Sequence, residues 1–315
     1  MLPVLNLIVP VFNEAENLPE LYRRLDGVAA DILAECEFLF VDDGSTDGTA
    51  RLLAAFAEQD ARVRVLHFSR NFGHQAAVTA GLEHARGDAV VILDGDLQDP
   101  PELLPTLLER WREGYDVVYA VRTKRKEHLL KRAAYALFYR SLRATAEIVL
   151  PVDSGDFCLM DRRVVDAINA MPERGRFVRG LRAYAGFRQV GVQYERDARY
   201  AGAPKYTLRK LVALALQGVV NFSTFPVQLL AWLSVLCLTL AFALAVWSSI
   251  AGFTTAGVIL CVVIALSGVH LAGLAILGWY LLQIFTEVKA RPAYILGPPT
   301  VVPNHAERQP TTMHV

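Results

Sequence analysis

The stretch Glu37-Phe38-Leu39-Phe40-Val41-Asp42-Asp43-Gly44-Ser45-Thr46-Asp47-Gly48 joins an apolar run to an acidic turn. Three similar apolar, β-rich runs lie in the first hundred residues, at Leu5–Phe12, Val63–Phe68 and Ala89–Leu93. Helical stretches separate the four runs: Leu18–Leu33, Thr49–Gln59 and Gln75–Ala85. Short apolar runs that alternate with amphipathic helices predict an α/β fold, with a mostly parallel sheet and helices on both faces. A further strand is predicted at 116–122.

Polar residues follow the predicted strands. They are Asn13, Glu14, Asp42, Asp43, Asp94 and Asp96. In open parallel sheets, ligands bind beyond the carboxyl ends of the strands, so these side chains are expected to share one site. The motif Leu93-Asp94-Gly95-Asp96-Leu97-Gln98-Asp99-Pro100 offers two carboxylates and an amide oxygen for a hard divalent cation. Such a cation would bridge a diphosphate, although strand-end acids can also serve only as turn or helix-cap residues.

Charge and cysteine content exclude some classes of protein. The 315 residues contain 32 Lys plus Arg and 32 Asp plus Glu, which argues against a nucleic-acid partner. The four cysteines form no CxxC pair, so neither a disulfide framework nor a zinc site is predicted. Hydrophobic residues make up 53% of the chain, and no Asp, Glu, Lys or Arg occurs from Leu211 to Thr286. The chain therefore suits one domain of ordinary size with a membrane segment attached.

Two spans of that segment, 225–251 and 256–285, each exceed the roughly 20 helical residues that cross a bilayer. Basic residues precede the first span and follow the second, and the turn at 252–255 has none. The positive-inside rule then places 1–204 and the tail 286–315 in the cytoplasm, with the end of the tail disordered. A hairpin buried inside a soluble protein is the alternative. The basic stretch 128–150 and residues 205–224 are expected to be interfacial amphipathic helices, or else solvated helices packed on the domain.

Several motifs together resemble a known family. In order and spacing, Val9–Leu18, Val41–Thr49, Ser69–Gly73 and Asp94–Pro100 are similar to family 2 glycosyltransferases with the GT-A fold. Ser154-Gly155-Asp156-Phe157-Cys158-Leu159-Met160 and Arg199-Tyr200-Ala201-Gly202-Ala203-Pro204-Lys205-Tyr206 resemble the branch that acts on polyprenyl phosphates. That branch includes dolichyl-phosphate mannose synthases and bacterial undecaprenyl-phosphate glucosyltransferases. The resemblance covers the chain to about Pro299.

The resemblance implies a role for each matching residue. Those implied to bind the nucleotide-sugar are Pro10, Phe12, Glu14, Asp42, Asp43, Asp94, Gly95 and Arg122. Those implied to hold Mg²⁺ or Mn²⁺ are Asp94, Asp96 and Gln98. Those implied to bind the acceptor phosphate are Arg132, Arg199 and Lys205. Asp96 and Asp156 are the expected catalytic residues. Asp156 is expected to position the acceptor rather than act as a base, because a lipid phosphate is already anionic at neutral pH; the alternative is a loop Asp that caps the helix at Arg162.

The leading function is transfer of one hexose from a nucleotide-sugar to undecaprenyl phosphate, at the cytoplasmic face of a bacterial inner membrane. The enzyme is expected to be metal-dependent, inverting, multi-pass and homotetrameric. UDP-glucose is the favoured donor, with GDP-mannose, UDP-N-acetylhexosamine and UDP-aminoarabinose open. A processive polysaccharide synthase is disfavoured by the absence of a Gln-x-x-Arg-Trp motif. A non-catalytic membrane tether with a relict nucleotide-binding domain is the alternative of a different class, and the complete acidic motifs count against it.

Overall fold

A computed structural model of the chain describes residues 3–122, 154–195 and 255–298, together with scattered residues between 232 and 250. The chain forms two units. The first, called the catalytic unit below, comprises Met1–Lys126, Pro151–Pro204 and Pro292–Val315. The second comprises Glu127–Leu150 and Lys205–Arg291. The catalytic unit is therefore built from three separate stretches of chain.

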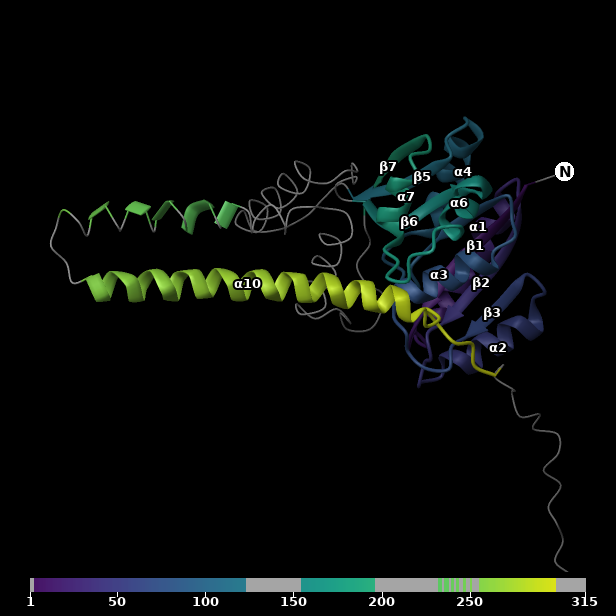
Figure 1. The fold of residues 1–315 in the computed structure, drawn as a ribbon. Helices are drawn as coiled ribbons and strands as arrows, with labels where there is room; N and C mark the ends of the chain where they lie inside the picture. The colour runs from purple at the N-terminus through teal and green to yellow at the C-terminus, as the bar shows by residue number, and fades with distance from the viewer. Residues whose placement is uncertain are drawn as a thin grey trace, which may run out of the picture. The chain divides into compact units, whose positions relative to one another are not determined.

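The catalytic unit is centred on a seven-stranded sheet (Figure 1). Its strands are β1 (Val4–Val11), β2 (Glu35–Asp42), β3 (Val63–His67), β4 (Ala89–Ile92), β5 (Val117–Arg122), β6 (Ser154–Asp161) and β7 (Gln189–Tyr194). They lie in the order β3-β2-β1-β4-β6-β5-β7. Strand β6 runs antiparallel to both of its neighbours, and every other pairing is parallel. The expected mostly parallel sheet is confirmed.

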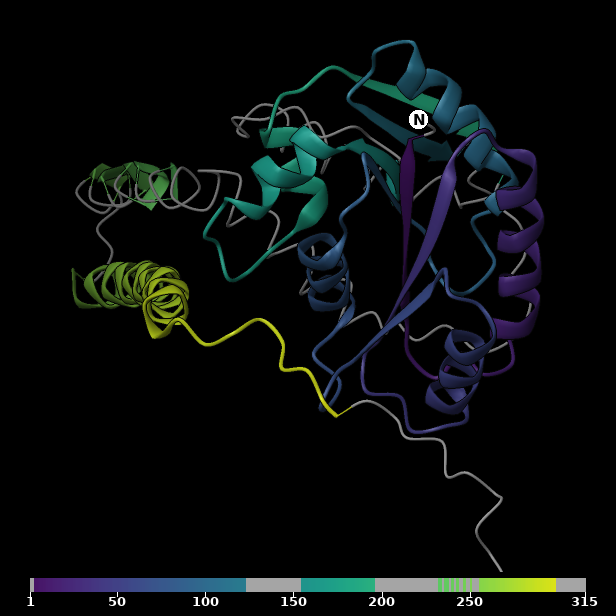
Figure 2. The same ribbon diagram turned by 90° about the vertical axis from the view of Figure 1, so that its right-hand side faces the viewer.

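Helices cover both faces of this sheet. They are α1 (Leu18–Asp31), α2 (Thr49–Gln59), α3 (His74–His84), η1 (Pro101–Leu103), α4 (Leu104–Arg112), α6 (Arg162–Asn169) and α7 (Val178–Tyr184). Alternate residues of β1 point to opposite faces. Leu7 belongs to the cluster that includes α1 and α4, whereas Ile8 packs so closely on α3 that a Cβ at Gly81 would lie 2.3 Å from it. Figure 2 shows α1 and α3 on opposite sides of the sheet.

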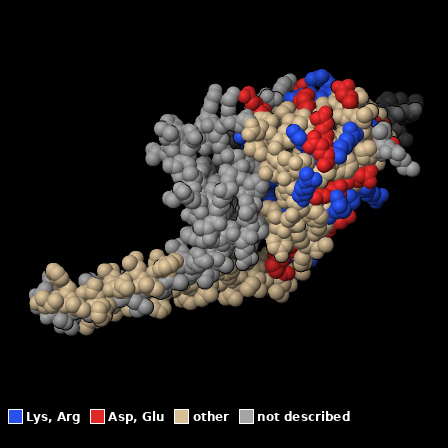
Figure 3. All heavy atoms as spheres, turned by 90° about the horizontal axis from the view of Figure 1, so that it is seen from above, with Lys and Arg blue, Asp and Glu red and all other residues tan. Residues whose placement is uncertain are grey.

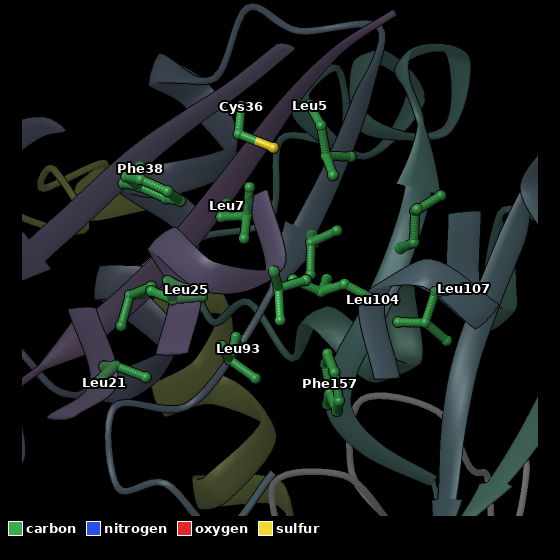
Figure 4. Close-up of a cluster of buried hydrophobic side chains, with 14 of the residues drawn as sticks. Leu5, Leu7, Leu21, Leu25, Cys36, Phe38, Leu93, Leu104, Leu107 and Phe157 are labelled. Carbon is green, nitrogen blue, oxygen red and sulfur yellow. The ribbon is translucent and has the colours of Figure 1, made fainter. Parts of the chain in front are cut away.

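The larger core lies between the sheet and the helices α1 and α4. Leu7, Leu25 and Leu107 are each at most 1% exposed, and Figure 4 shows their side chains within one cluster of buried apolar residues. Phe157 of β6 joins the same cluster and is fully buried. Burying side chains of this size contributes roughly 1.5–3 kcal/mol each. Because a strand alternates its faces, Phe157 in this core turns its neighbour Asp156 towards the face that carries α3 and α7.

The five strands predicted from the sequence are present within one or two residues of their expected ends, and α2 has the expected bounds. Strands β6 and β7 were not predicted. Asp156 lies within β6 and not in a loop, and the residue that caps α6 is Asp161, whose carboxylate accepts from Arg163 N at 3.0 Å. The alternative role for Asp156 as a helix cap is therefore wrong.

The second unit contains α10 (Thr255–Lys289), a helix of 35 residues that includes the second expected span. It is the one helix among the described residues that is long and apolar enough to cross a membrane, with a mean hydropathy of 2.5. Most of its described atoms in Figure 3 belong to uncharged residues. Of the first expected span, 225–251, scattered residues are described, and those are helical. The expected interfacial segments 128–150 and 205–224 lie outside the described residues.

The first prediction concerns Gly44, in the turn after β2. Its φ is +69°, and a Cβ there would lie 2.4 Å from the carbonyl carbon of Arg70. Gly44→Ala should therefore destabilise the catalytic unit by about 2 kcal/mol, because both the backbone conformation and a rigid neighbour resist it. Gly27→Ala is the matched control: it lies in α1 with open space around it, so it should raise the melting temperature slightly. Thermal unfolding of the detergent-solubilised protein measures both, and equal melting temperatures would contradict the expectation.

Candidate functional site

The ends of β1 and β2 are tied together by side chains from both loops. Asn13 N donates to Ser45 Oγ at 2.9 Å, and Thr46 N donates to Asn13 Oδ1 at 2.8 Å. Asn13 has a φ of +52°, a left-handed conformation that asparagine tolerates better than most residues. Asp42 accepts from Ser45 N at 3.0 Å, and its other oxygen lies 3.1 Å from His67 Nδ1. These contacts fix the first wall of a site at the carboxyl end of the sheet.

Asp43 joins this wall to the loop between β3 and α3. Its carboxylate accepts from Phe72 N at 2.6 Å and from Gly73 N at 2.9 Å. Burial raises the pKa of Asp43, and the two backbone hydrogen bonds oppose that rise. Gly44 lets the same loop approach closely at Arg70. The Asp42–Asp43 pair does not cap α2, which has no side-chain hydrogen bond at its cap; it connects three strand ends.

The second acidic motif forms a tight turn after β4. Leu97, with a φ of +59°, is 1% exposed and anchors the turn in the core. Gln98 N donates to Asp96 Oδ1 at 3.1 Å. A Cβ at Gly95 would lie 2.9 Å from a methyl of Val11, so only glycine lets the turn pack this closely on β1. Asp94 and Asp96 are consequently held beside the end of β1.

The antiparallel strand β6 brings Asp156 to the same place. Ile92 of β4 pairs with Cys158 of β6. In an antiparallel pair the next residues along run in opposite directions, so Asp94 and Asp156 follow at corresponding positions. His74, the first residue of α3, lies between their carboxylates: its Nε2 is 3.2 Å from Asp156 Oδ2 and 3.8 Å from Asp94 Oδ1.

Arg179 of α7 also binds the carboxylate of Asp156. Its Nε donates to Oδ1 at 2.7 Å and its Nη2 donates to Oδ2 at 3.0 Å, a bidentate pair. Burial opposes ionisation of Asp156, but Arg179 and His74 outweigh it and hold the pKa of this carboxyl well below its usual range. Burial likewise opposes charging of His74, yet Asp156 and Asp94 raise the pKa of its imidazole to about 9. At neutral pH the cluster therefore contains an ionised Asp156 between two cations.

Arg122, at the end of β5, is held in place by a chain of two hydrogen bonds. Its Nε donates to Tyr194 Oη at 3.3 Å, and the Tyr194 hydroxyl in turn donates to the buried Asp99. Burial and Asp99 raise the pKa of Tyr194 to about 12, so this hydroxyl stays protonated. A Cβ at Gly155 would lie 3.3 Å from Arg122 Nη2, which places the guanidinium beside the residue before Asp156. A fixed cation thus lies at the edge of the carboxylate cluster.

The structure brings most of the expected site residues to one end of the sheet. Pro10 is in β1, Phe12 and Glu14 follow it, and Glu14 accepts from Asn17 Nδ2. Residues that lie outside the described part of the chain are Arg132, Arg199 and Lys205. The sequence reasoning missed His74 and Arg179 as site residues. His74 adjoins the motif that ends at Gly73, which was a usable signal, whereas nothing in the sequence around Arg179 indicates its partner.

The carboxylates suit a divalent cation that is shared with a diphosphate. Burial raises the pKa of Asp94 to about 6, and the negative charges of Asp99, Asp156 and Asp96 add to that rise. An added cation would relieve this crowding. Among the described residues no group of three or more His, Cys, Asp or Glu side chains is arranged to hold a metal. Mg²⁺-type sites commonly use one or two carboxylates and complete their shell with water and phosphate oxygens, so the residues present fit such an ion.

Comparison with known proteins gives a consistent result. Residues 6–168 match the family model described as Glycosyl transferase family 2. The uncharacterised glycosyltransferase YkcC of Bacillus subtilis is 42% identical over 92% of this chain and 92% of its own length. The bactoprenol glucosyl transferase of Shigella phage SfII is 38% identical over 93% of this chain and 97% of its own length. Among solved structures, glucosyl-3-phosphoglycerate synthase from Mycobacterium tuberculosis aligns with a TM-score of 0.47 and 20% identity, over 69% of this chain and 77% of its own.

The second prediction concerns the cluster itself. Asp156→Asn removes the negative charge that helps to raise the pKa of His74 and leaves only a neutral amide oxygen as acceptor, so that pKa should fall well below about 9. Histidine-selective NMR titration in EDTA measures it. Asp166→Asn, an exposed acid on α6 with a side chain that is 64% exposed, should leave the titration of His74 unchanged. An unchanged pKa in Asp156→Asn would contradict the pairing of His74 with Asp156.

Proposed function

This chain belongs to glycosyl transferase family 2, and we propose that it transfers a single hexose from a nucleotide-sugar to a polyprenyl phosphate at a membrane surface. It is a glycosyltransferase with an α/β fold of the GT-A type. The similarity to bactoprenol glucosyl transferases extends over 93% of the chain, well beyond the residues that the family model matches. The observation that carries the proposal is the juxtaposition of Asp94 and Asp96 with an ionised Asp156.

The donor is proposed to lie across the ends of β1, β2 and β4. Asp42 and Asp43 use much of their hydrogen-bonding capacity to hold the loops, so their main contribution is a rigid nucleoside pocket, completed by Pro10, Phe12 and Glu14. UDP-glucose is the proposed sugar donor; GDP-mannose, UDP-N-acetylhexosamine and UDP-aminoarabinose are the alternatives that the assay below separates.

Asp94 and Asp96, with Gln98, are proposed to hold Mg²⁺ or Mn²⁺ beside Gly95. When bound, the ion stabilises the negative charge that develops on the departing nucleoside diphosphate. The protein supplies the rigid turn that fixes the two carboxylates. Arg122 lies close enough to the same cluster to bind a donor phosphate oxygen.

The reaction is proposed to be an in-line displacement with inversion. An oxygen of the lipid phosphate attacks the anomeric carbon, and the bond from that carbon to the nucleoside diphosphate breaks. The attacking phosphate is already anionic and needs no general base. The low pKa of Asp156 and its bidentate pairing with Arg179 make it a poor proton acceptor. Asp156 is accordingly proposed to position the reacting groups, through the two cations that it holds.

The acceptor phosphate is proposed to be held by Arg132, Arg199 and Lys205. Two anionic substrates repel each other, so a site that joins them needs cations on both sides. Arg122 is shared between the two substrates in this proposal. A homotetramer, suggested by the resemblance to bacterial relatives, stays a prediction.

The docked position of the chain after α10 supports a two-span topology. Leu296 forms a β-bridge with Phe68, so both residues must lie on the same side of any membrane that the chain crosses. The intervening chain must therefore cross an even number of times. If α10 is one crossing, a second is required, and the apolar residues 225–251 are the natural place for it. We infer a hairpin in the bacterial inner membrane, with the catalytic unit in the cytoplasm.

The alternative, a non-catalytic tether, is disfavoured because the acidic motif is complete and is held in a fixed turn. Nothing in a tether requires two crowded carboxylates opposite a third.

The third prediction tests activity. Membranes that contain the protein, with added undecaprenyl phosphate and Mg²⁺ or Mn²⁺, should form a radiolabelled glycolipid from one nucleotide-sugar in a panel, with UDP-glucose expected. EDTA should abolish the product, and Asp96→Asn should lower kcat by at least ~10², as loss of a preorganised electrostatic group does. Asp166→Asn should retain full activity. Absence of product with every donor, or full activity in EDTA, would contradict the proposal.

The fourth prediction tests topology. Thr254→Cys should react with a membrane-impermeant maleimide added outside intact cells, and Val301→Cys should react only after the membrane is opened. The unmodified chain provides the background from its own cysteines. The reverse labelling pattern would refute the orientation and with it access to a cytoplasmic donor.

A further inference from the structure

The chain that follows α10 returns to the catalytic unit and pairs with it. Ser69 N donates to Ile295 O at 2.9 Å, and Gly297 N donates to His67 O at 2.8 Å. A Cβ at Gly297 would lie 3.3 Å from Ser69, so the two backbones are in close contact. Residues 292–297, called the strap below, therefore lie against the end of β3 and form an isolated β-bridge with Phe68 there.

Tyr294 anchors the strap through its side chain. Its ring stacks on Phe68 with 4.9 Å between centroids and 11° between planes. Its hydroxyl donates to Glu83 Oε2, at the end of α3, at 2.6 Å. The ring of His84 meets it edge-on at 6.3 Å. One side chain thus bridges the end of β3 and the end of α3, the two elements joined by the loop 69–73.

Phe68 links this anchor to the proposed donor pocket. Its ring meets Phe72 edge-on at 5.7 Å, and Phe72 N is the donor that reaches Asp43 Oδ1 at 2.6 Å. Two aromatic residues in ring contact, Phe68 and Phe72, therefore connect Tyr294 to the carboxylate of Asp43. The loop 69–73 is held at one end by Asp43 and at the other by the strap.

We propose that Tyr294 is a positioning residue for the donor site. It fixes Phe68, and through Phe68 and Phe72 it keeps the loop 69–73 in the conformation that Asp43 requires. The inference rests on the proposed binding of a nucleotide-sugar at this end of the sheet. A loop that is already ordered does not lose further conformational freedom when ligand binds, so the strap increases affinity without touching the ligand. Only Ala290–Ala293 separate the last residue of α10 from Tyr294, so donor affinity depends on the segment next to the membrane helix.

The test uses the full chain in mild detergent, with UDP and Mn²⁺ as the probe. Tyr294→Ala should weaken UDP binding measured by calorimetry roughly threefold to tenfold, the range expected for loss of a ring contact, and should raise the donor KM by the same factor. The kcat should stay within about twofold of wild type, because the strap contacts no reacting group. Tyr294→Phe keeps the stacking and should recover most of the affinity. Ile295→Ala is the matched control, since that residue is 53% exposed and its hydrogen bond with Ser69 is made by the backbone carbonyl.

Hydrogen exchange provides a readout that does not depend on the proposed function. The amides of Phe72 and Gly73 should exchange faster in Tyr294→Ala than in wild type, and at the wild-type rate in Ile295→Ala. Tyr294→Leu, which fills a similar volume without a ring, replaces Tyr294→Ala if the latter does not fold. Wild-type affinity and wild-type exchange in the Tyr294 variant, or equal losses in Ile295→Ala, would overturn the proposal. If wild-type protein does not bind UDP, the proposed donor fails, and the exchange rates alone decide whether the strap orders the loop.

Discussion

The antiparallel pairing of β6 between β4 and β5 is the constraint on which the site depends. A wholly parallel sheet would bring only the carboxyl ends of its strands to this edge. Reversing β6 brings its first residues there instead, with Asp156 next to Asp94. The core enforces this arrangement, because Phe157 is fully buried on the opposite face. A slip of one residue in β6 would exchange the two side chains between faces, placing a charge in the core.

The charges at this edge act as one system. The carboxylates of Asp94, Asp96 and Asp156 would repel one another if the cations His74 and Arg179 did not lie beside them. The two cations differ in their geometry: Arg179 forms a bidentate pair with Asp156, whereas His74 faces both Asp156 and Asp94. Asp94 consequently keeps a raised pKa, and Asp156 a lowered one. Two carboxylates of the same chemistry therefore differ in their pKa values, which suits the proposed roles of Asp94 in binding a cation and of Asp156 in positioning.

Much of the fold follows from the sequence because its first half repeats one simple pattern. Apolar runs such as Leu5–Phe12 are buried on both faces when they form interior strands of a sheet covered by helices. The polar residues that end these runs mark the site. Strand β6 lacks this signal, since it begins with Ser154, Gly155 and Asp156. The partnership of Arg179 with Asp156 could not be predicted, because it depends on how α7 packs over β6. The pairing of the strap with Phe68 could likewise not be predicted from the sequence, because it depends on how the end of β3 is placed in the folded unit.

The strap also determines the order in which the protein can fold. Synthesis starts at the N-terminus, so β3 and its neighbours leave the ribosome long before residues 292–297 exist. Until then the edge next to β3 has no partner from the end of the chain, and unpaired strand edges are sites where nascent chains associate wrongly. The residues that pair with Phe68 follow shortly after the apolar helix α10. Completion of the catalytic unit is thus tied to prior synthesis of the apolar helix α10.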